Sequence, residues 1–411
     1  MRILFVHERF GALAGAEANL YITAAEFKKR GHSVGVLHGA STGKNEAGWN
    51  AVFSSRFALQ EKDNERTVEA ALREFSPQVV YVHKMADLSV IEPLVQSGLP
   101  LVRMVHDHDI YCMRSYKYFY LSRKICTKAA GWHCVFSCGA FLARNRSGGL
   151  PIKLLSYSEK KREIELNKCF NRMVVVTRYM RDELLRNGFS ENKIEIHAPV
   201  PRMAEGEFQS QFSDRNLIIF AGQIIRGKGV DVLLESLALV QEPFECIILG
   251  EGSHKAYCEK LCRKLGLQDR VHFPGFVPQE ELKNYYRECS LFAISSVWPE
   301  PFATVGVEVM RCGIPVIAFD AGGIRDWLHD GFNGFLVPWM DRKTYAKKID
   351  LLLRDKSLAR ELGENGRELV NQQYDFDTYI DGLEDMFLRV TKECQSTRLE
   401  VKPPSELLRS A

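Results

Sequence analysis

Two carboxylates, Glu300 and Glu308, flank the sequence Pro301-Phe302-Ala303-Thr304. Proline favours the first position of a helix, so we expect a helix to begin near Pro301–Thr304, with Glu300 at its mouth and Glu308 about two turns in. Free backbone N–H groups at a helix start suit an anionic or hydroxyl-rich ligand, and carboxylates can accept hydrogen bonds from sugar hydroxyls. On spacing alone, a helix with a surface glutamate at each end is the alternative.

A basic, glycine-rich turn lies in the same half of the chain. It runs from Gly222 to Gly229, contains Arg226 and Lys228, and separates an expected strand at Leu217–Ala221 from an expected helix at Val230–Val240. The backbone N–H groups of a strand-to-helix turn can bind phosphate. Taken by itself, however, a basic turn is more often a solvated loop than a phosphate site.

Two segments of the first half have related features. Gly15 lies in a turn that leads into the helix expected at Ala16–Arg30, where backbone N–H groups can approach a phosphate. His106 follows the strand expected at Leu101–Val105. A histidine at the carboxyl end of a strand can bond sugar hydroxyls or move protons, and a structural histidine is the alternative.

The elements that must position these residues are short apolar runs alternating with helical patterns, which are typical of parallel βαβ units. The expected strands of the first half are Ile3–Val6, Val34–Leu37, Val79–Val82, Leu101–Val105 and Val174–Thr177. Those of the second half are Leu217–Ala221, Cys246–Leu249, Val271–Phe273, Leu291–Ile294, Pro315–Phe319 and Phe335–Val337. Two such series predict an α/β protein with two Rossmann-like domains, whose parallel sheets face each other across a ligand-binding cleft.

The domain boundaries follow from composition. We expect one domain at 1–200 and a second at 201–375, joined by the polar, proline-bearing stretch Pro199–Asp214. Helical apolar spacing over Tyr379–Val390 predicts a terminal helix at 376–395 that crosses back to the first domain. A polar tail is expected at 396–411.

Composition narrows the class of protein. The chain has 411 residues, of which 45% are hydrophobic and 26% charged, as is ordinary for a soluble globular protein. No apolar run reaches the roughly 18 residues that a membrane span needs, and the N-terminus has the pattern of a buried strand rather than a signal peptide. We therefore expect a cytoplasmic protein. The odd number of cysteines, 11, argues against a disulfide framework.

The net charge of +3 is unevenly distributed. Residues 1–200 contain 29 Lys and Arg against 20 Asp and Glu, and the surplus peaks between Arg103 and Lys168, with 13 basic and 5 acidic residues. One interpretation is an anionic partner, such as a peripheral contact with a membrane face or a charged glycan, and the other is a solvated surface. No nucleic-acid partner is expected, because the chain lacks a basic-aromatic motif and its second half is acidic.

The stretch from Ser295 to Val337 resembles the retaining GT-B glycosyltransferases of group 1, or family 4. The matching residues are Ser296, Glu300-Pro301-Phe302-Ala303, Glu308-Val309-Met310, Gly313-Ile314-Pro315-Val316-Ile317-Ala318, Gly322-Gly323 and Gly331-Phe332-Asn333-Gly334-Phe335-Leu336-Val337. The resemblance implies that Glu300 faces the donor sugar, that Glu308 binds the ribose, and that the backbone of Pro301, Phe302, Ala303 and Thr304 holds sugar hydroxyls and phosphate. The chain departs from the pattern at Ala303, where glycine is usual, and at Arg325 and Asp326.

Other segments extend the resemblance. The turn beginning at Gly222 is similar to a loop whose arginine and lysine neutralise the diphosphate. Lys228 matches, whereas Gln223 replaces the arginine, and we expect Arg226 to substitute for it. Further donor contacts implied by the resemblance are Gly250 after a strand, the backbone near Val277 at the nucleobase, Gly15 at a phosphate, and His106 at the donor sugar. The resemblance does not make His106 the general base, because the donor phosphate takes that role in retaining members.

These residues together predict a retaining hexosyltransferase, with Glu300, His106 and Lys228 as catalytic residues. The donor is expected to be a nucleotide diphosphate sugar bound mainly to the second domain, without a cofactor or catalytic metal. The acceptor, a glycan, a lipid-linked sugar or another molecule of cell-surface polysaccharide synthesis, is expected on the first domain. A GT-B sugar-nucleotide epimerase and a catalytically silent nucleotide-sugar-binding protein are the alternatives.

Two features stay outside this scheme. Cys112, Cys126, Cys134 and Cys138 could hold a structural zinc ion, form a local disulfide or remain thiols; their spacing lacks the paired knuckles of common zinc sites, so thiols are the expectation. The basic, patchily apolar segment Arg144–Lys168 could be an acceptor loop, a membrane-touching element, or a connector followed by a helix.

Overall fold

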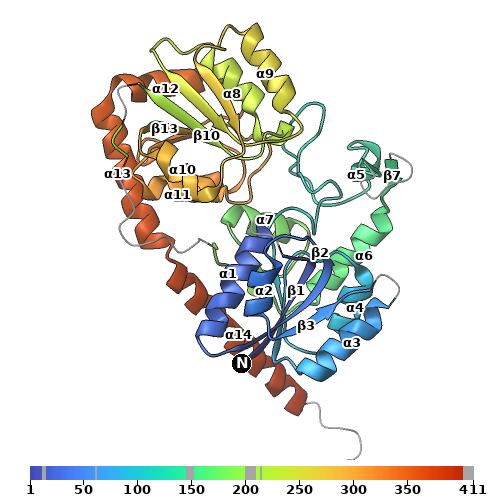
Figure 1. Ribbon diagram of the computed structural model, residues 1–411. Coiled ribbons are helices and arrows are strands. Elements are labelled where there is room, and N and C mark those ends of the chain that lie inside the picture. The colour runs from blue at the N-terminus through green and yellow to red at the C-terminus, as the bar shows by residue number, and fades with distance from the viewer. Residues whose placement is uncertain (12–14, 61–62, 145–151, 200–209, 213–214, 401–411) are drawn as a thin grey trace, which may run out of the picture.

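The computed structural model describes residues 1–11, 15–60, 63–144, 152–199, 210–212 and 215–400. It contains two parallel sheets with helices on both faces, one sheet in each half of the chain (Figure 1). The GT-B architecture expected from the sequence is confirmed. Most of the stretch expected to join the two halves lies outside the described residues, so the domain boundaries stay a prediction.

The first sheet has seven parallel strands in the order β3-β2-β1-β4-β5-β8-β9. Its strands are β1 Arg2–Phe10, β2 Ser33–Ser41, β3 Ser55–Ala58, β4 Val79–Val82, β5 Leu101–Met104, β8 Arg172–Val175 and β9 Ile194–Ile196. The helices of this half are α1 Ala16–Lys29, α2 Glu46–Val52, α3 Asn64–Phe75, α4 Leu88–Gln96, α5 His133–Phe136, α6 Tyr157–Lys168 and α7 Arg178–Arg186. All five expected strands are present. The edge strands β3 and β9 were missed because each is short and only partly buried.

The second sheet has six parallel strands in the order β12-β11-β10-β13-β14-β15. Its strands are β10 Leu217–Ala221, β11 Glu245–Leu249, β12 Val271–Gly275, β13 Cys289–Ile294, β14 Val316–Phe319 and β15 Gly334–Val337. The helices are α8 Val230–Leu237, α9 Lys255–Lys264, α10 Gln279–Tyr286, α11 Thr304–Arg311, α12 Arg342–Arg354, α13 Lys356–Gln373 and α14 Phe376–Glu400. The six expected strands are confirmed because most of their apolar residues are buried, as parallel strands inside a sheet require; burial alternates in the edge strand β12.

An excursion leaves the first sheet between β5 and α6 and projects beside the gap between the two halves (Figure 1). It carries the one-turn helix α5 and the antiparallel hairpin of β6 Leu142–Arg144 and β7 Ile152–Leu154. The segment Arg144–Lys168 therefore contains a strand and the helix α6, as the connector interpretation expects, although residues 145–151 lie outside the described part. The three short 3₁₀ turns are η1 Glu191–Lys193, η2 Arg226–Lys228 and η3 Gly323–Asp326.

The terminal helix α14 crosses from the second half to the first, as expected (Figure 1). Phe387 stacks on Phe27 of α1 at a centroid distance of 5.5 Å. The hydroxyl of the buried Tyr379 accepts a hydrogen bond from Asn19 Nδ2 at 3.1 Å. Arg30, just after α1, also forms an ion pair with Asp381 of α14 at 2.5 Å. The expected end at residue 395 is wrong, because α14 continues to Glu400 and takes in the first residues of the expected tail.

Among the described helices, none has the combined length and apolar character required to cross a bilayer. The two halves instead share one continuous core, in which residues of β1, β5 and α14 are buried together with residues of α11 and β14. This shared core holds the two sheets, and the loops at their strand ends, in one arrangement.

We predict that Tyr379→Phe destabilises the protein by about 1–2 kcal/mol, because the buried Asn19 amide loses its acceptor. Chemical denaturation followed by circular dichroism measures the effect. Tyr257→Phe, at a side chain that is 54% exposed, is the control and should change the unfolding free energy by less than about 0.5 kcal/mol. Equal stability of wild type and Tyr379→Phe would show that this contact does not hold α14 in place.

Candidate functional site

The helix expected at the acidic pair begins at Thr304, as α11. Ala303 is its N-cap and has a left-handed backbone, with φ 60° and ψ 62°. A side chain in this conformation costs roughly 1 kcal/mol relative to glycine, which explains why the resembled pattern has glycine at this position. The turn redirects the chain so that Glu300 lies just before the start of α11, which is the arrangement expected from Pro301.

The Glu300 carboxylate is buried and bound by three donors. Lys228 Nζ lies 2.7 Å from Glu300 Oε1, Trp298 Nε1 donates to the same oxygen at 2.8 Å, and the Ser296 hydroxyl also contacts it. Burial alone would raise the pKa of Glu300, but the charge of Lys228 and these hydrogen bonds outweigh it and hold the pKa below its usual range. The carboxylate is therefore ionised at neutral pH.

The lysine is held in place by the glycine-rich turn. Gly229 has φ 66°, and a Cβ atom there would lie 2.0 Å from the carbonyl oxygen of Ser295, so only glycine fits. The Ser295 hydroxyl donates to the Lys228 carbonyl at 2.9 Å. Since Lys228 and Glu300 follow neighbouring strands, β10 and β13, parallel pairing brings the two loops to the same edge of the sheet.

The other predicted donor-binding residues lie on several loops. Gly222 and Gly250 are packed together, since a Cβ atom on Gly250 would meet the Gly222 carbonyl oxygen at 1.9 Å. Glu308 lies further along α11, where its charge contributes to the raised pKa of Tyr286, after the larger effect of burial. Val277 is half-buried after β12. Gly15 is the N-cap of α1 in the first half, and among the described residues, its chain neighbours aside, no atom lies within 4 Å of its Cβ position.

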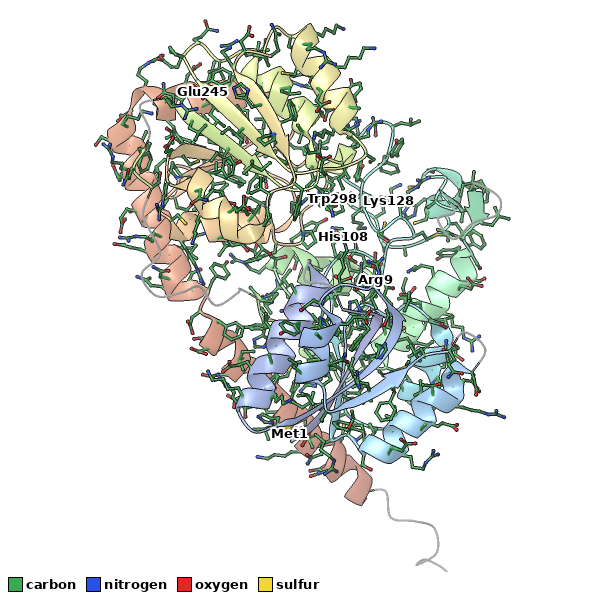
Figure 2. All side chains as sticks on the ribbon, viewed as in Figure 1. Met1, Arg9, His108, Lys128, Glu245 and Trp298 are labelled. Atoms are coloured by element: carbon green, nitrogen blue, oxygen red, sulfur yellow. The ribbon has the colours of Figure 1, made fainter. Side chains whose placement is uncertain are left out.

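The first half supplies two contacts beside Glu300 that the sequence analysis did not predict. His108 Nε2 lies 2.8 Å from the carbonyl oxygen of Pro299, and the Thr177 hydroxyl donates to the carbonyl of Pro301 at 2.8 Å. Because a carbonyl only accepts, His108 carries its proton on Nε2. These two bonds from the first half hold the backbone immediately before and after Glu300. Figure 2 shows His108 and Trp298 between the two halves.

The excursion also reaches the second half. Arg123 forms a buried ion pair with Asp231 at 2.6 Å, and the Tyr116 ring lies 5.9 Å from the Trp298 ring. The Arg226 guanidinium stacks over Tyr120, 4.8 Å from the ring centroid. In this arrangement Arg226 contacts the excursion, so its expected contact with a diphosphate stays a prediction.

His106 is paired with a second histidine. His83 Nδ1 lies 2.9 Å from His106 Nε2, and the two rings stack at 5.1 Å. Burial, aided by the neighbouring His7 and Lys84, lowers the pKa of His106 to about 3, and burial also lowers the pKa of His83. Both rings are thus neutral at pH 7, when His106 can hydrogen-bond a hydroxyl but holds no extra proton to give.

A small cavity of about 20 Å³, lined by several charged side chains, lies at the carboxyl ends of β4 and β5, next to His106. Lys84 bridges Asp107 and Asp109 at 2.6 and 2.7 Å. Burial raises the pKa of Asp107 to about 6. The cavity wall also contains the buried Arg103 and Glu163, each with side-chain atoms that have no hydrogen-bond partner among the described residues. Unsatisfied polar groups of this kind suit a hydroxyl-rich ligand.

The four clustered cysteines share one neighbourhood. Burial is the main cause of the raised pKa of Cys134, and the nearby Cys112 and Cys126 add to it. Burial likewise raises the pKa of Cys138. All four are free thiols, and the described residues contain no group of three or more His, Cys, Asp or Glu arranged to hold a metal ion. The structure thus offers no zinc geometry and no disulfide here.

Two family models match the chain. The model described as Glycosyltransferase Family 4 matches residues 13–199, and the model described as Glycosyl transferases group 1 matches residues 204–369. The first match covers most of the first sheet, and the second covers all of the second sheet, including the Lys228–Glu300 contact.

Characterised and uncharacterised relatives match over part of their length. An uncharacterized glycosyltransferase of Methanocaldococcus jannaschii is 30% identical over 40% of this chain and 42% of that protein. The D-inositol 3-phosphate glycosyltransferase of Xylanimonas cellulosilytica is 31% identical over 44% of this chain and 43% of that protein. The chain therefore spans less than half the length of these two curated relatives.

Solved structures match almost the whole chain. Anabaena HepE in complex with UDP-glucose has a TM-score of 0.70 and 19% identity, over 95% of this chain and 100% of that one. The apo form of the lipopolysaccharide outer core galactosyltransferase WaaB has a TM-score of 0.69 and 15% identity, over 95% and 99%. At this identity the likeness concerns the fold.

The buried histidines predict acid sensitivity. Burial lowers the pKa of His7 to about 4 and that of His83 well below its usual value. The unfolded chain therefore binds more protons than the folded chain below about pH 6.5, and stability falls as the pH drops toward 4, by at most about 1.4 kcal/mol per pH unit for each group. Asp107, whose pKa burial raises, acts in the opposite direction below about pH 6.

The test compares variants, so that the Asp107 contribution cancels. Urea denaturation at pH 7.5 and pH 5.5 should show that His83→Gln loses less stability than wild type between the two values. His272→Gln, at an exposed position in β12, should lose as much as wild type. An identical loss in His83→Gln would show that His83 takes up a proton in the folded state.

Proposed function

We propose that this chain, which belongs to the group 1 glycosyltransferases, transfers a hexose from a nucleotide diphosphate sugar to an acceptor, with retention at the anomeric carbon. The observation that carries the proposal is the contact between Lys228 and Glu300 at the mouth of α11. It joins a cation for the diphosphate to a carboxylate for the sugar, beside a helix N-terminus. The nucleotide-sugar complexes of a structural neighbour support the same class of donor.

In the proposed mechanism, Lys228 stabilises the negative charge that develops on the diphosphate as the sugar leaves. An ammonium group has three N–H donors, so Lys228 can bind a phosphate oxygen while it keeps its bond to Glu300. Because this cation is part of the chain, the chemistry needs no metal. Gly15 and Arg226 would add N–H donors to the diphosphate from the two sides of the cleft.

Glu300 would accept a hydrogen bond from a hydroxyl of the donor sugar. Among the described residues, the hydrogen bonds to its carboxylate all end on Oε1, so Oε2 is the atom expected to meet the sugar. The backbone of Pro301, Phe302, Ala303 and Thr304 would hold hydroxyls and phosphate. Gly222, Gly250 and Val277 would border the nucleotide, with Glu308 at the ribose.

His106 would contact the donor sugar near the reacting carbon as a neutral ring. Its low pKa, caused mainly by burial, argues against a role as general base or acid at neutral pH, which leaves the donor phosphate to take the acceptor proton. His83 would orient the ring through the bond to Nε2.

The acceptor would bind the first half beside the small cavity, where Asp107, Asp109 and Lys84 can bond hydroxyls. A glycan or a lipid-linked sugar of cell-surface polysaccharide synthesis fits this chemistry. The enzyme would then work in the cytoplasm at the inner membrane face.

Thermal-shift measurements with UDP, GDP and their sugars test the donor. The true donor should stabilise the protein in proportion to the logarithm of its concentration, by about 2.7 kcal/mol at 100 times its Kd. Lys228→Ala should weaken binding at least tenfold, because it removes a charged contact worth about 1.5–3 kcal/mol. Lys347→Ala, at an exposed position in α12, should bind as wild type does. No response to any nucleotide would overturn the proposed donor class.

Product analysis tests the reaction. The anomeric proton coupling of the product, measured by nuclear magnetic resonance, should match that of the donor, and Glu300→Gln should lower kcat at least about 100-fold, since it removes the charge while keeping the shape. Inversion would contradict the retaining mechanism. Isomerisation of the donor without an acceptor would indicate an epimerase, and donor binding without turnover would indicate a silent binding protein.

A further inference from the structure

The excursion, residues 110–158, has an extreme charge distribution. Eight Lys and Arg and no Asp or Glu lie within residues 110–158, although Asp107, Asp109 and Glu159 lie just beyond these bounds and the whole chain is nearly balanced at 55 basic and 52 acidic residues. Two of the cations are used internally, since Lys117 pairs with Glu183 at 2.9 Å and Arg123 with Asp231, all of them buried. Others, including Lys124 and Lys128, are exposed.

The same excursion carries much of the exposed apolar surface. Of the 15 large hydrophobic side chains that are exposed among the described residues, eight lie between Tyr116 and Leu154. Leu121 is 87% exposed, and on α5 and β7 or beside them Phe136 is 80%, Leu154 77% and Trp132 66% exposed. Single exposed hydrophobic residues are ordinary, but a concentration of them marks an interaction surface.

Packing contacts and buried ion pairs hold the excursion that carries these side chains. The centroid of the Trp132 ring lies 6.3 Å from that of Phe136 and 5.1 Å from that of Tyr157, the first residue of α6. The buried ion pairs of Lys117 and Arg123 fasten the base of the excursion to both halves of the molecule. Figure 1 shows α5 and β7 projecting away from the two sheets.

We propose that α5 and Leu154 of β7, with Lys128 near α5 and the exposed Lys124 further along the same excursion, form a docking surface for an anionic lipid bilayer. We infer this occupant from charge complementarity, because a surface with an excess of cations is attracted to anionic headgroups. Tryptophan and phenylalanine prefer the boundary between headgroups and acyl chains. Together these groups give reversible, peripheral binding.

The location of this surface suggests how a lipid-linked acceptor would reach the site. The identity of that acceptor rests on the proposed function, whereas the docking surface does not. The base of the excursion borders the cleft, where Tyr116 lies beside Trp298 and Arg226 stacks over Tyr120. A membrane bound at the tip would therefore lie next to the entrance of the acceptor side. The enzyme would collect a lipid-linked acceptor directly from the bilayer.

Vesicle flotation without nucleotide tests the surface independently of the reaction. The full chain should float with vesicles of phosphatidylcholine containing about a third phosphatidylglycerol and remain unbound with pure phosphatidylcholine. The double variant Trp132→Ser/Phe136→Ser and the double variant Lys124→Glu/Lys128→Glu should each weaken binding at least tenfold. Added salt should weaken it further.

Matched controls lie on the far side of the second half. Phe332→Ser/Leu351→Ser removes exposed hydrophobic side chains, and Lys343→Glu/Lys347→Glu reverses exposed charges on α12; both should bind vesicles as wild type does. Donor-induced thermal shifts should be normal in all four variants, which shows that they fold. If the wild-type chain bound vesicles but showed no donor-induced thermal shift, the result would count against the proposed function and not against the docking surface.

Two results would overturn the docking surface. One is a failure of the wild-type chain to bind anionic vesicles, or equally tight binding by wild type and by Trp132→Ser/Phe136→Ser. The other is self-association: if sedimentation shows a dimer that Trp132→Ser/Phe136→Ser dissociates, the surface is occupied by a second copy of the chain.

Discussion

The ion pair between Lys228 and Glu300, which lie 72 residues apart in the chain, is the contact on which the arrangement of the site depends. Glu300 is 3% exposed, and a carboxylate at such a position is stable only when cations and hydrogen-bond donors surround it. Removing Lys228, which is 24% exposed, would leave this buried carboxylate without its cation and so destabilise the fold. The strand ends, the glycine turn and the start of α11 are therefore constrained to meet at this point, so the preorganisation of the site is part of the stability of the second half.

The first half completes that arrangement through backbone atoms. The side chains of His108 and Thr177 bond the backbone carbonyl groups on either side of Glu300, while Gly323 of the second half donates to the Glu300 carbonyl at 2.7 Å. The carboxylate thus lies on a loop that both halves position. A movement of one sheet relative to the other would therefore change the orientation of Glu300.

The sequence predicted the parts that depend on local pattern. Apolar runs identified the central strands, and the spacing around Pro301 located the start of α11, because burial and helix-start preferences act within a few residues. The roles of Lys228 and Glu300 came from a resemblance, and parallel strand order then explains why the two meet. The contacts of His108 and Thr177 could not be predicted, since they form only when two separately encoded halves pack. The strands β3 and β9 were missed because edge strands need little apolar character.

Ala303 shows that contacts around a turn can stabilise a left-handed backbone at a residue other than glycine. The left-handed turn before α11 favours glycine, yet the chain has a side chain there and keeps the turn. The neighbouring bonds explain why: Trp327 donates to the Phe302 carbonyl at 2.6 Å, and Gly306 donates to the Ala303 carbonyl at 2.9 Å. Several such bonds outweigh a strain of roughly 1 kcal/mol. The geometry around Glu300 is thus determined by the surrounding contacts more than by the residue at the turn, so the substitution alone does not argue for an inactive protein.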